Sequence, residues 1–228
     1  MMDKRNIFFR KAGWAAIASG AIGILSFVAL MAAVSSRNSL IISRQGMLLF
    51  RTHDAGVILQ FLLLLPAVFV LYYYLQQKSP GISKNMRNTG VAAIACTVLF
   101  LLMIFPNILA DILYMFPQGI FGVWLIIINL KLKGILPVGL RWFGMIVGVG
   151  LAMVGIFPPA YAIFVDAILI HIPAPPPELI EKIPVDTPAN IFLHKILFIG
   201  SFMGVLTLPF WSILLGVIFL KKNKKQAM

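Results

Sequence analysis

The sequence predicts an all-helical protein, a polytopic membrane bundle of about six transmembrane helices with both termini in the cytoplasm. Hydrophobic residues make up 61% of the 228 positions, and the mean hydropathy is +0.98. Several uninterrupted apolar runs reach the roughly 20 residues that a helix needs to cross a hydrocarbon core about 30 Å thick. Lys and Arg stand almost entirely at the ends of these runs. Lipid is therefore the expected solvent for most of the chain.

Six crossings and their connections use the whole length, so we expect one integral membrane domain over residues 1–228 and no separate soluble domain. Charges, prolines or polar turns bound each crossing. The crossings are expected at residues 14–34, 57–75, 91–106, 119–132, 142–157 and 196–220.

The first crossing follows a basic N-terminal segment. Cationic residues between Lys4 and Lys11 precede the apolar run at 14–34. A cleaved signal peptide has a similar start but an apolar region of only about 7 to 15 residues. We therefore expect an uncleaved crossing.

The segment before the second crossing has a mixed pattern. Between residues 35 and 55, apolar side chains alternate with Arg37, Arg44 and Arg51. Such a mixture suits a helix that lies in the head-group layer. Residues 35–55 are therefore expected to rest on the outer surface of the membrane.

The third and fourth crossings leave two positions open for the turn between them. Either Pro106 or Pro117 could end a helix, because proline lacks the backbone N–H that a helix interior uses.

The fifth and sixth crossings carry small residues four apart. Gly144, Gly148 and Ala152 share one face of the fifth, and Gly200 and Gly204 share one face of the sixth. Small residues let helix backbones approach closely in lipid, where packing drives association. We interpret these faces as internal packing seams rather than a dimer interface.

The loop between the last two crossings, 173–190, contains six prolines. Proline at this density favours extended, stiff backbone. A solvated linker is the simpler interpretation, and the alternative is a segment that docks a protein partner.

Orientation follows from the distribution of Lys and Arg. Positively charged loops stay in the cytoplasm, so the side with more Lys and Arg is assigned there. This places both termini inside and favours an even number of crossings. The outer side holds Arg37, Arg44, Arg51, Lys182 and Lys195; the inner side holds the other fourteen of the 19, namely Lys4, Arg5, Arg10, Lys11, Lys78, Lys84, Arg87, Lys131, Lys133, Arg141, Lys221, Lys222, Lys224 and Lys225.

The same distribution bears on partners. A net charge of +12 could suggest nucleic acid, but the cations border apolar runs, where they meet lipid head groups. We expect membrane lipids as partners and no nucleic acid.

Ionisable residues at the outer ends are the candidate functional groups. Counted from Arg141 at about 1.5 Å per residue, Asp166 lies roughly 38 Å along a straight helix, beyond a core about 30 Å thick. The same count from Leu220 puts His194 about 39 Å away. The candidates at this outer rim are His53, Asp111, Asp166, His171 and His194.

These five residues are also the candidate metal ligands. A zinc ion held by three protein ligands and one water would suit hydrolysis near the membrane surface. No pair among them has the local spacing of a ligand motif, such as two histidines four apart on a helix. No cofactor is therefore predicted, and zinc remains an alternative.

Residues 119–148 carry a family resemblance. An apolar helix with Gly119 and Gly122, a basic turn ending at Leu136-Pro137, and a Gly-rich helix up to Gly148 resemble the central segment of a family of small bacterial membrane proteins, a domain of unknown function. Val154-Gly155-Ile156 stands where the family has an aromatic pair. The resemblance implies a six-helix fold in the bacterial inner membrane and no particular activity.

Three functions are compatible with this sequence. A nearly charge-free interior favours a non-catalytic accessory or structural membrane protein. A small-molecule or lipid transporter would need a polar cavity near Gln60 or Asn129, midway through expected crossings. A metal-dependent membrane hydrolase would need the outer-rim residues to converge.

Overall fold

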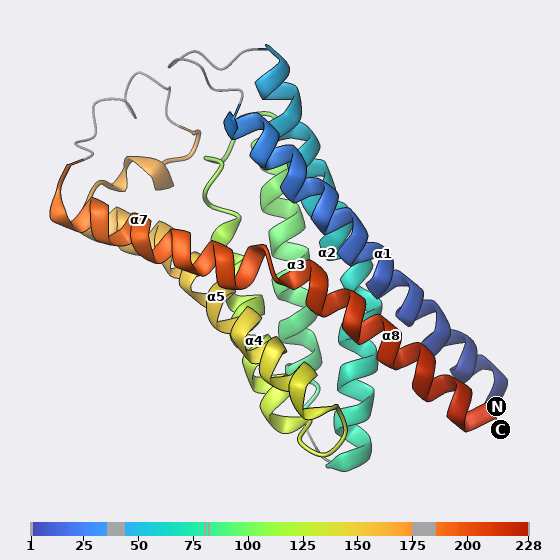
Figure 1. Cartoon of the computed structure of the whole chain (residues 1–228). Coiled ribbons are helices and arrows are strands. Elements are labelled where there is room, and N and C mark those ends of the chain that lie inside the picture. The colour runs from blue at the N-terminus through green and yellow to red at the C-terminus, as the bar shows by residue number, and fades with distance from the viewer. Residues whose placement is uncertain (1, 36–43, 80, 82, 175–185, 228) are drawn as a thin grey trace. The chain divides into compact units, whose positions relative to one another are not determined.

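The computed structural model describes residues 2–35, 44–79, 81, 83–174 and 186–227. Every element of regular structure in these ranges is a helix, which confirms the all-helical fold class (Figure 1). The elements are α1 (Met2–Ser35), α2 (Arg44–Lys78), α3 (Asn85–Ile104), α4 (Met115–Lys131), α5 (Val138–Phe164), the 3-10 helix η1 (Ala167–Ile170), α7 (Pro188–Gly200), the π-helix η2 (Ser201–Val205) and α8 (Leu208–Ala227).

Five helical segments in the described residues are long and apolar enough to cross a membrane. They are Asn6–Ser35, Gly46–Lys78, Asn85–Ile104, Val138–Phe164 and Pro188–Lys222, the last formed by α7, η2 and α8 together. The shorter α4 is apolar and has 17 residues. The chain is thus a multi-helix protein of the membrane class.

The predicted surface segment at 35–55 is wrong for the residues described. Residues 44–55 form the first part of α2, which continues unbroken to Lys78. No proline occurs in α2 before Pro66, so nothing in the sequence separates the mixed segment from the apolar run that follows. Residues 36–43 lie outside the described residues.

The turn between the third and fourth crossings falls at Pro106. Helix α3 ends at Ile104, and Asn107 adopts a positive φ of 58°, a conformation that Asn tolerates better than most residues. Pro117 lies in the first turn of α4, where a helix does not need its backbone N–H.

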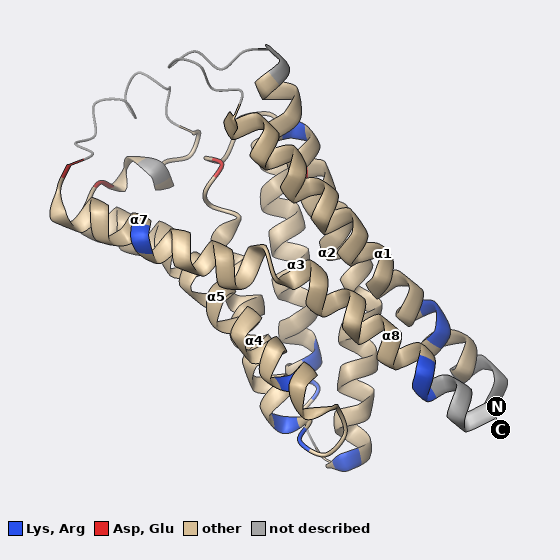
Figure 2. Ribbon diagram, in the orientation of Figure 1, with Lys and Arg blue, Asp and Glu red and all other residues tan. Residues whose placement is uncertain are grey.

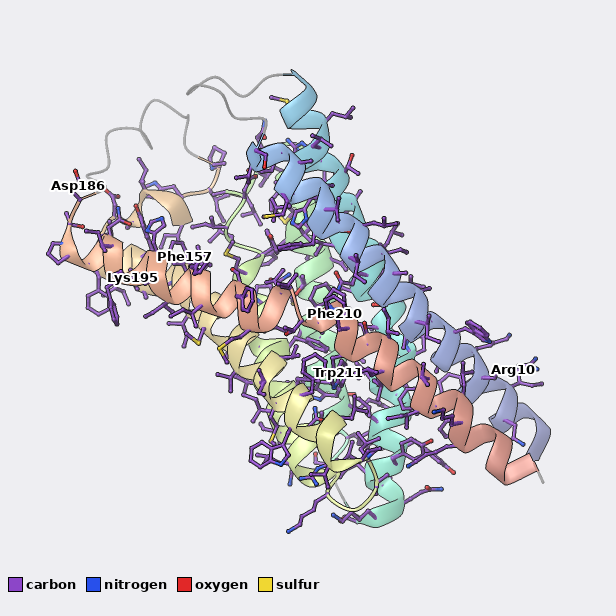
Figure 3. All side chains as sticks on the ribbon, viewed as in Figure 1. Arg10, Phe157, Asp186, Lys195, Phe210 and Trp211 are labelled. Carbon is purple, nitrogen blue, oxygen red and sulfur yellow. The ribbon has the colours of Figure 1, made fainter. Side chains whose placement is uncertain are left out.

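The chain contacts divide into two compact units, described here in turn. The first comprises residues 1–82 and 208–228, with α1 packed against both α2 and α8. Helix α1 runs antiparallel to α8, because Gly13 lies against Leu220 whereas Gly20 lies against Pro209 and Ile213. The start of α1 and the end of α8 therefore share one end of this unit. On α8, Trp211 is buried while its neighbour Phe210 is exposed (Figure 3).

The second unit comprises residues 83–207, and α5 is its central helix. Helix α4 packs antiparallel to α5, with Gly119 against Gly155 and Gly122 against Gly148. On another side of α5, Gly150 meets Gly204 of η2, and Gly200 of α7 packs close to Met153. The predicted packing seams through Gly148, Gly200 and Gly204 are therefore confirmed as internal contacts.

The proline-rich loop is only partly described. Residues 175–185, and with them most of the predicted partner-docking segment at 173–190, lie outside the described residues. At its edges, the Ala174 N–H donates to the Ile108 carbonyl (3.1 Å), and Thr187 caps α7 by accepting a hydrogen bond from the Asn190 N–H (3.2 Å).

Candidate functional site

The five predicted outer-rim residues do not form a metal centre in the described part of the chain. His53 belongs to the first unit, whereas Asp111, Asp166, His171 and His194 belong to the second. Among the described residues, no group of three or more His, Cys, Asp or Glu side chains is placed to hold a metal ion.

His53 joins two helices of the first unit. Its ring is buried, and Nδ1 lies 3.0 Å from the carbonyl oxygen of Ser26 on α1. A carbonyl can only accept a hydrogen bond, so Nδ1 carries the proton in this contact. The prediction had placed His53 ahead of the second crossing, but α2 begins nine residues earlier, at Arg44.

A second hydrogen bond joins α1 and α2, seven residues away from the first on each helix. The Ser19 hydroxyl donates to the carbonyl of Gln60 at 2.8 Å. Ser19 and Ser26 are seven residues apart on α1, and His53 and Gln60 are seven apart on α2, so each pair recurs on one helix face. We call these four residues, Ser19, Ser26, His53 and Gln60, the α1–α2 polar seam.

The seven-residue spacing within each pair of the α1–α2 polar seam can be read from the sequence. Gly23, midway between the two serines, has no side chain, and a Cβ atom there would lie 2.7 Å from the Gln60 amide. Gln60 can be singled out in the sequence as a polar residue within an apolar run, but its partners on α1 cannot, because they are distant in sequence.

Gln60 and Asn129, the two residues assigned to a transport path, both lie in close packing. Gln60 is 5% exposed, and its Nε2 has no hydrogen-bond partner among the described residues. Asn129, in the second unit, is fully buried and donates from Nδ2 to the Leu125 carbonyl of its own helix (2.8 Å).

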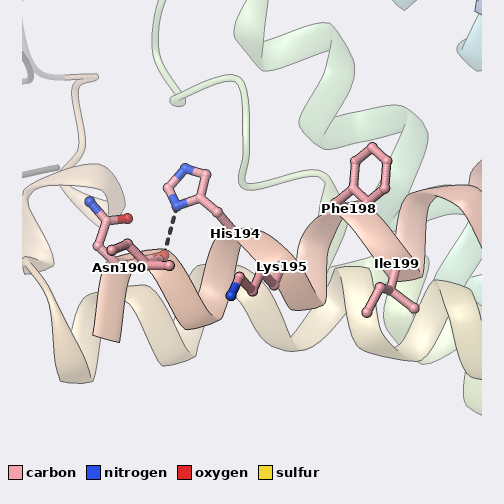
Figure 4. A pocket seen from close by; sticks show the side chains of 6 residues that line it. Asn190, His194, Lys195, Phe198 and Ile199 are labelled. Carbon is pink, nitrogen blue, oxygen red and sulfur yellow. Dashed lines mark hydrogen bonds between the residues drawn. The ribbon is translucent and has the colours of Figure 1, made fainter. Parts of the chain in front are cut away.

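An aromatic cluster surrounds His194 in the second unit. The His194 ring meets Phe157 and Tyr161 of α5 edge-on, with ring centroids 5.5 and 6.3 Å away. Its Nδ1 donates to the carbonyl of Asn190 one turn earlier, at 2.9 Å (Figure 4). In the neutral ring, Nε2 is then the hydrogen-bond acceptor. Phe157, Tyr161 and His194 are called the His194 cluster below.

A groove of about 630 Å³ lies along α7 beside this cluster. It is lined by Asn190, Ile191, His194, Lys195, Phe198 and Ile199 (Figure 4). Its side chains combine an imidazole and an ammonium group with apolar surface. This chemistry suits a molecule with a polar head and an apolar body.

Two predicted candidates lie at the end of α5 in the same unit. Asp166 accepts a hydrogen bond from the Ile168 N–H (2.8 Å) and so caps η1, and His171 follows η1 with an exposed side chain. Asp166 therefore has a structural role as a cap.

Comparison with known proteins gives no relative: no family model, curated protein or solved structure matches the chain. The family resemblance of residues 119–148 therefore stays a prediction.

Proposed function

We propose that the protein is a non-catalytic accessory or structural protein of the bacterial inner membrane, with both termini in the cytoplasm. The supporting observation is how polar side chains between the helices are used. His53, Ser19 and Arg141 each donate a hydrogen bond to the backbone of a neighbouring helix. These groups stabilise helix contacts, a common use of polar residues in membrane bundles.

The orientation is supported by charge and by the first unit's geometry. The start of α1 and the end of α8 lie together, which supports a topology with both termini on one side of the membrane. The sequence near both is basic, which favours the cytoplasm. A C-terminal fusion to green fluorescent protein should fluoresce, and one to alkaline phosphatase should be inactive. The reverse pattern would contradict the orientation.

The function is tested with a fourfold alanine variant of Asp111, Asp166, His171 and His194. In any growth condition where a deletion strain is impaired, the variant should restore growth as well as the wild type. Size-exclusion chromatography of a fluorescent fusion checks that it is folded. A folded variant that fails to restore growth would overturn the proposal, because a scaffold does not depend on these ionisable groups.

The groove along α7 favours a second candidate, a transporter of lipids or other amphiphiles. The assay uses proteoliposomes with a fluorescent phospholipid in both leaflets and dithionite, which bleaches only the outer one. A scaffold bleaches no more lipid than protein-free vesicles do. Bleaching beyond the outer-leaflet share, lost on Lys195→Ala, would favour the transporter.

A metal-dependent hydrolase remains the third alternative from the sequence. Elemental analysis of the purified protein separates it from the scaffold. Stoichiometric zinc that is lost in the fourfold variant would favour the hydrolase.

A further inference from the structure

One end of the second unit concentrates positive charge from three helices. Five cationic residues lie here: Lys84 and Arg87 where α3 begins, Lys131 and Lys133 where α4 ends, and Arg141 where α5 begins. The basic positions at this end are visible in Figure 2. Residues 83–110 and 112–165 contain no Asp or Glu, so these helices supply no carboxylate to offset the charge. We call the five residues the cationic end.

Two hydrogen bonds fix the helices that make the cationic end. The Trp124 Nε1–H of α4 donates to the Met86 carbonyl of α3 at 2.7 Å. The Arg141 Nε–H of α5 donates to the Asn129 carbonyl of α4 at 3.0 Å. The charges are thus held on a packed three-helix frame.

Arg141 is the most buried of the five cations. Its side chain is 8% exposed, and the bond to Asn129 uses one of five guanidinium donors. Lys131 ends α4, Lys133 lies in the turn into α5, and both side chains are exposed. A guanidinium held by this bond, with two exposed ammonium groups near the same turn, suits the oxygens of a phosphate group.

The turn into α5 leaves room for such a group. Beta-carbon atoms built on Gly134 and Gly139 would meet no atom within 4 Å, so the backbone is open on both sides of Pro137. No side chain caps the start of α5, and the positive end of its helix dipole adds to the cationic charge.

Exposed apolar side chains border the same end and indicate the source of the phosphate. Val138 is 65% exposed, Trp142 60% and Leu130 54%. Tryptophan beside cations is typical of the boundary between hydrocarbon and head groups. A ligand with a phosphate and acyl chains would satisfy both the cations and this apolar border, whereas a free anion would satisfy only the cations.

We propose that the cationic end binds the head group of an anionic phospholipid, a phosphodiester such as that of phosphatidylglycerol. The head group's oxygens meet Arg141, Lys131 and Lys133, and its acyl chains lie against the apolar border. The site is independent of whether the protein is a scaffold or a transporter.

The test measures lipid retention by the purified full-length protein in native mass spectrometry. Phosphatidylglycerol, phosphatidylcholine and inorganic phosphate are added separately, and the Tm is recorded in parallel. Phosphatidylglycerol should stay bound and raise the Tm, whereas the other two should do neither. The double variant K131A/K133A should retain about 30-fold less, the factor for about 1 kcal/mol per lysine near a charged lipid.

Two further variants make this result interpretable. K131R/K133R keeps the charge and should restore retention, and K221A removes an exposed lysine of the first unit and should leave it unchanged. The Tm of K131A/K133A with phosphatidylcholine should equal that of the wild type, which excludes unfolding. Equal retention of the two lipids, or unchanged retention in K131A/K133A, would overturn the proposal. Stabilisation by inorganic phosphate alone would instead indicate a free-anion site.

Discussion

The α1–α2 pair of the first unit and the α4–α5 pair of the second illustrate two kinds of helix contact. In the first, side chains reach across to backbone carbonyls: His53 to Ser26, and Ser19 to Gln60. In the second, glycine backbones of α4 and α5 touch directly, as at Gly119 and Gly155. Lipid offers no hydrophobic drive for helix association, so both contacts rely on polar bonding or close packing.

The difference should appear in how each helix contact responds to mutation. A side-chain hydrogen bond can be removed with a bounded loss, because the freed carbonyl still accepts its own helix bond. A backbone contact cannot admit one extra carbon unless two helices move apart. The α4–α5 contact should therefore be the more sensitive of the two.

Gly119→Ala should give the largest effect. A Cβ atom there would lie 2.6 Å from the Gly155 Cα, and backbone atoms cannot rotate away. We expect a loss of about 3 kcal/mol, the upper part of the range for overpacking. Denaturant unfolding in detergent measures it, and Gly139→Ala, which meets no atom within 4 Å, is the control. Equal stability of the two variants would refute the close contact.

His53→Ala should rank second. It removes the bond to Ser26 and leaves a space in the α1–α2 polar seam, at a cost of about 2 kcal/mol. The same unfolding measurement applies. His171→Ala, at an exposed histidine, should change stability by less than about 0.5 kcal/mol. A loss for His53 no larger than for His171 would show that the seam contributes nothing.

Trp124→Phe tests the one long-range side-chain bond between α3 and α4 described above. The ring remains, but the Nε1–H that donates to Met86 is lost, at about 1 kcal/mol. Trp142→Phe, at a 60% exposed indole, is the matched control. If both substitutions lower the Tm equally, the Met86 bond is not the cause.

Ser19→Ala should have the smallest effect, about 0.6 kcal/mol, the average for polar contacts between membrane helices. Thr52→Ala is the control, because it removes a hydroxyl that donates to the Leu48 carbonyl of its own helix, α2, and not to a neighbouring helix. A loss above that of His53→Ala would reverse the order proposed for the seam.

Sequence alone predicted the helical membrane class, because apolar run length acts locally. It also found the small residues of α5 and α7. It missed what these residues touch: Gly119 and Gly155 are 36 positions apart, and nothing local pairs them. The buried position of His53 depends in the same way on Ser26, which is 27 residues away.

The tyrosines of α2 show the same limit. Tyrosine is common at the boundary between hydrocarbon and head groups, so residue type alone suggests rings that face this boundary. Tyr72 and Tyr74 are instead buried, and Tyr74 stacks on Phe9 of α1 with ring centroids 5.4 Å apart. Residue type does not determine whether a ring faces lipid, because that depends on the partner helix.

The length of α4 has a consequence for the surrounding bilayer. Its 17 residues span about 25 Å, whereas the 27 residues of α5, packed alongside, span about 40 Å. A hydrocarbon core of about 30 Å is too thick for the first and too thin for the second. Where both helices cross a bilayer, hydrophobic mismatch of both signs would arise within one helix pair, with lipids thinned beside α4 and α5 tilted or extending beyond them.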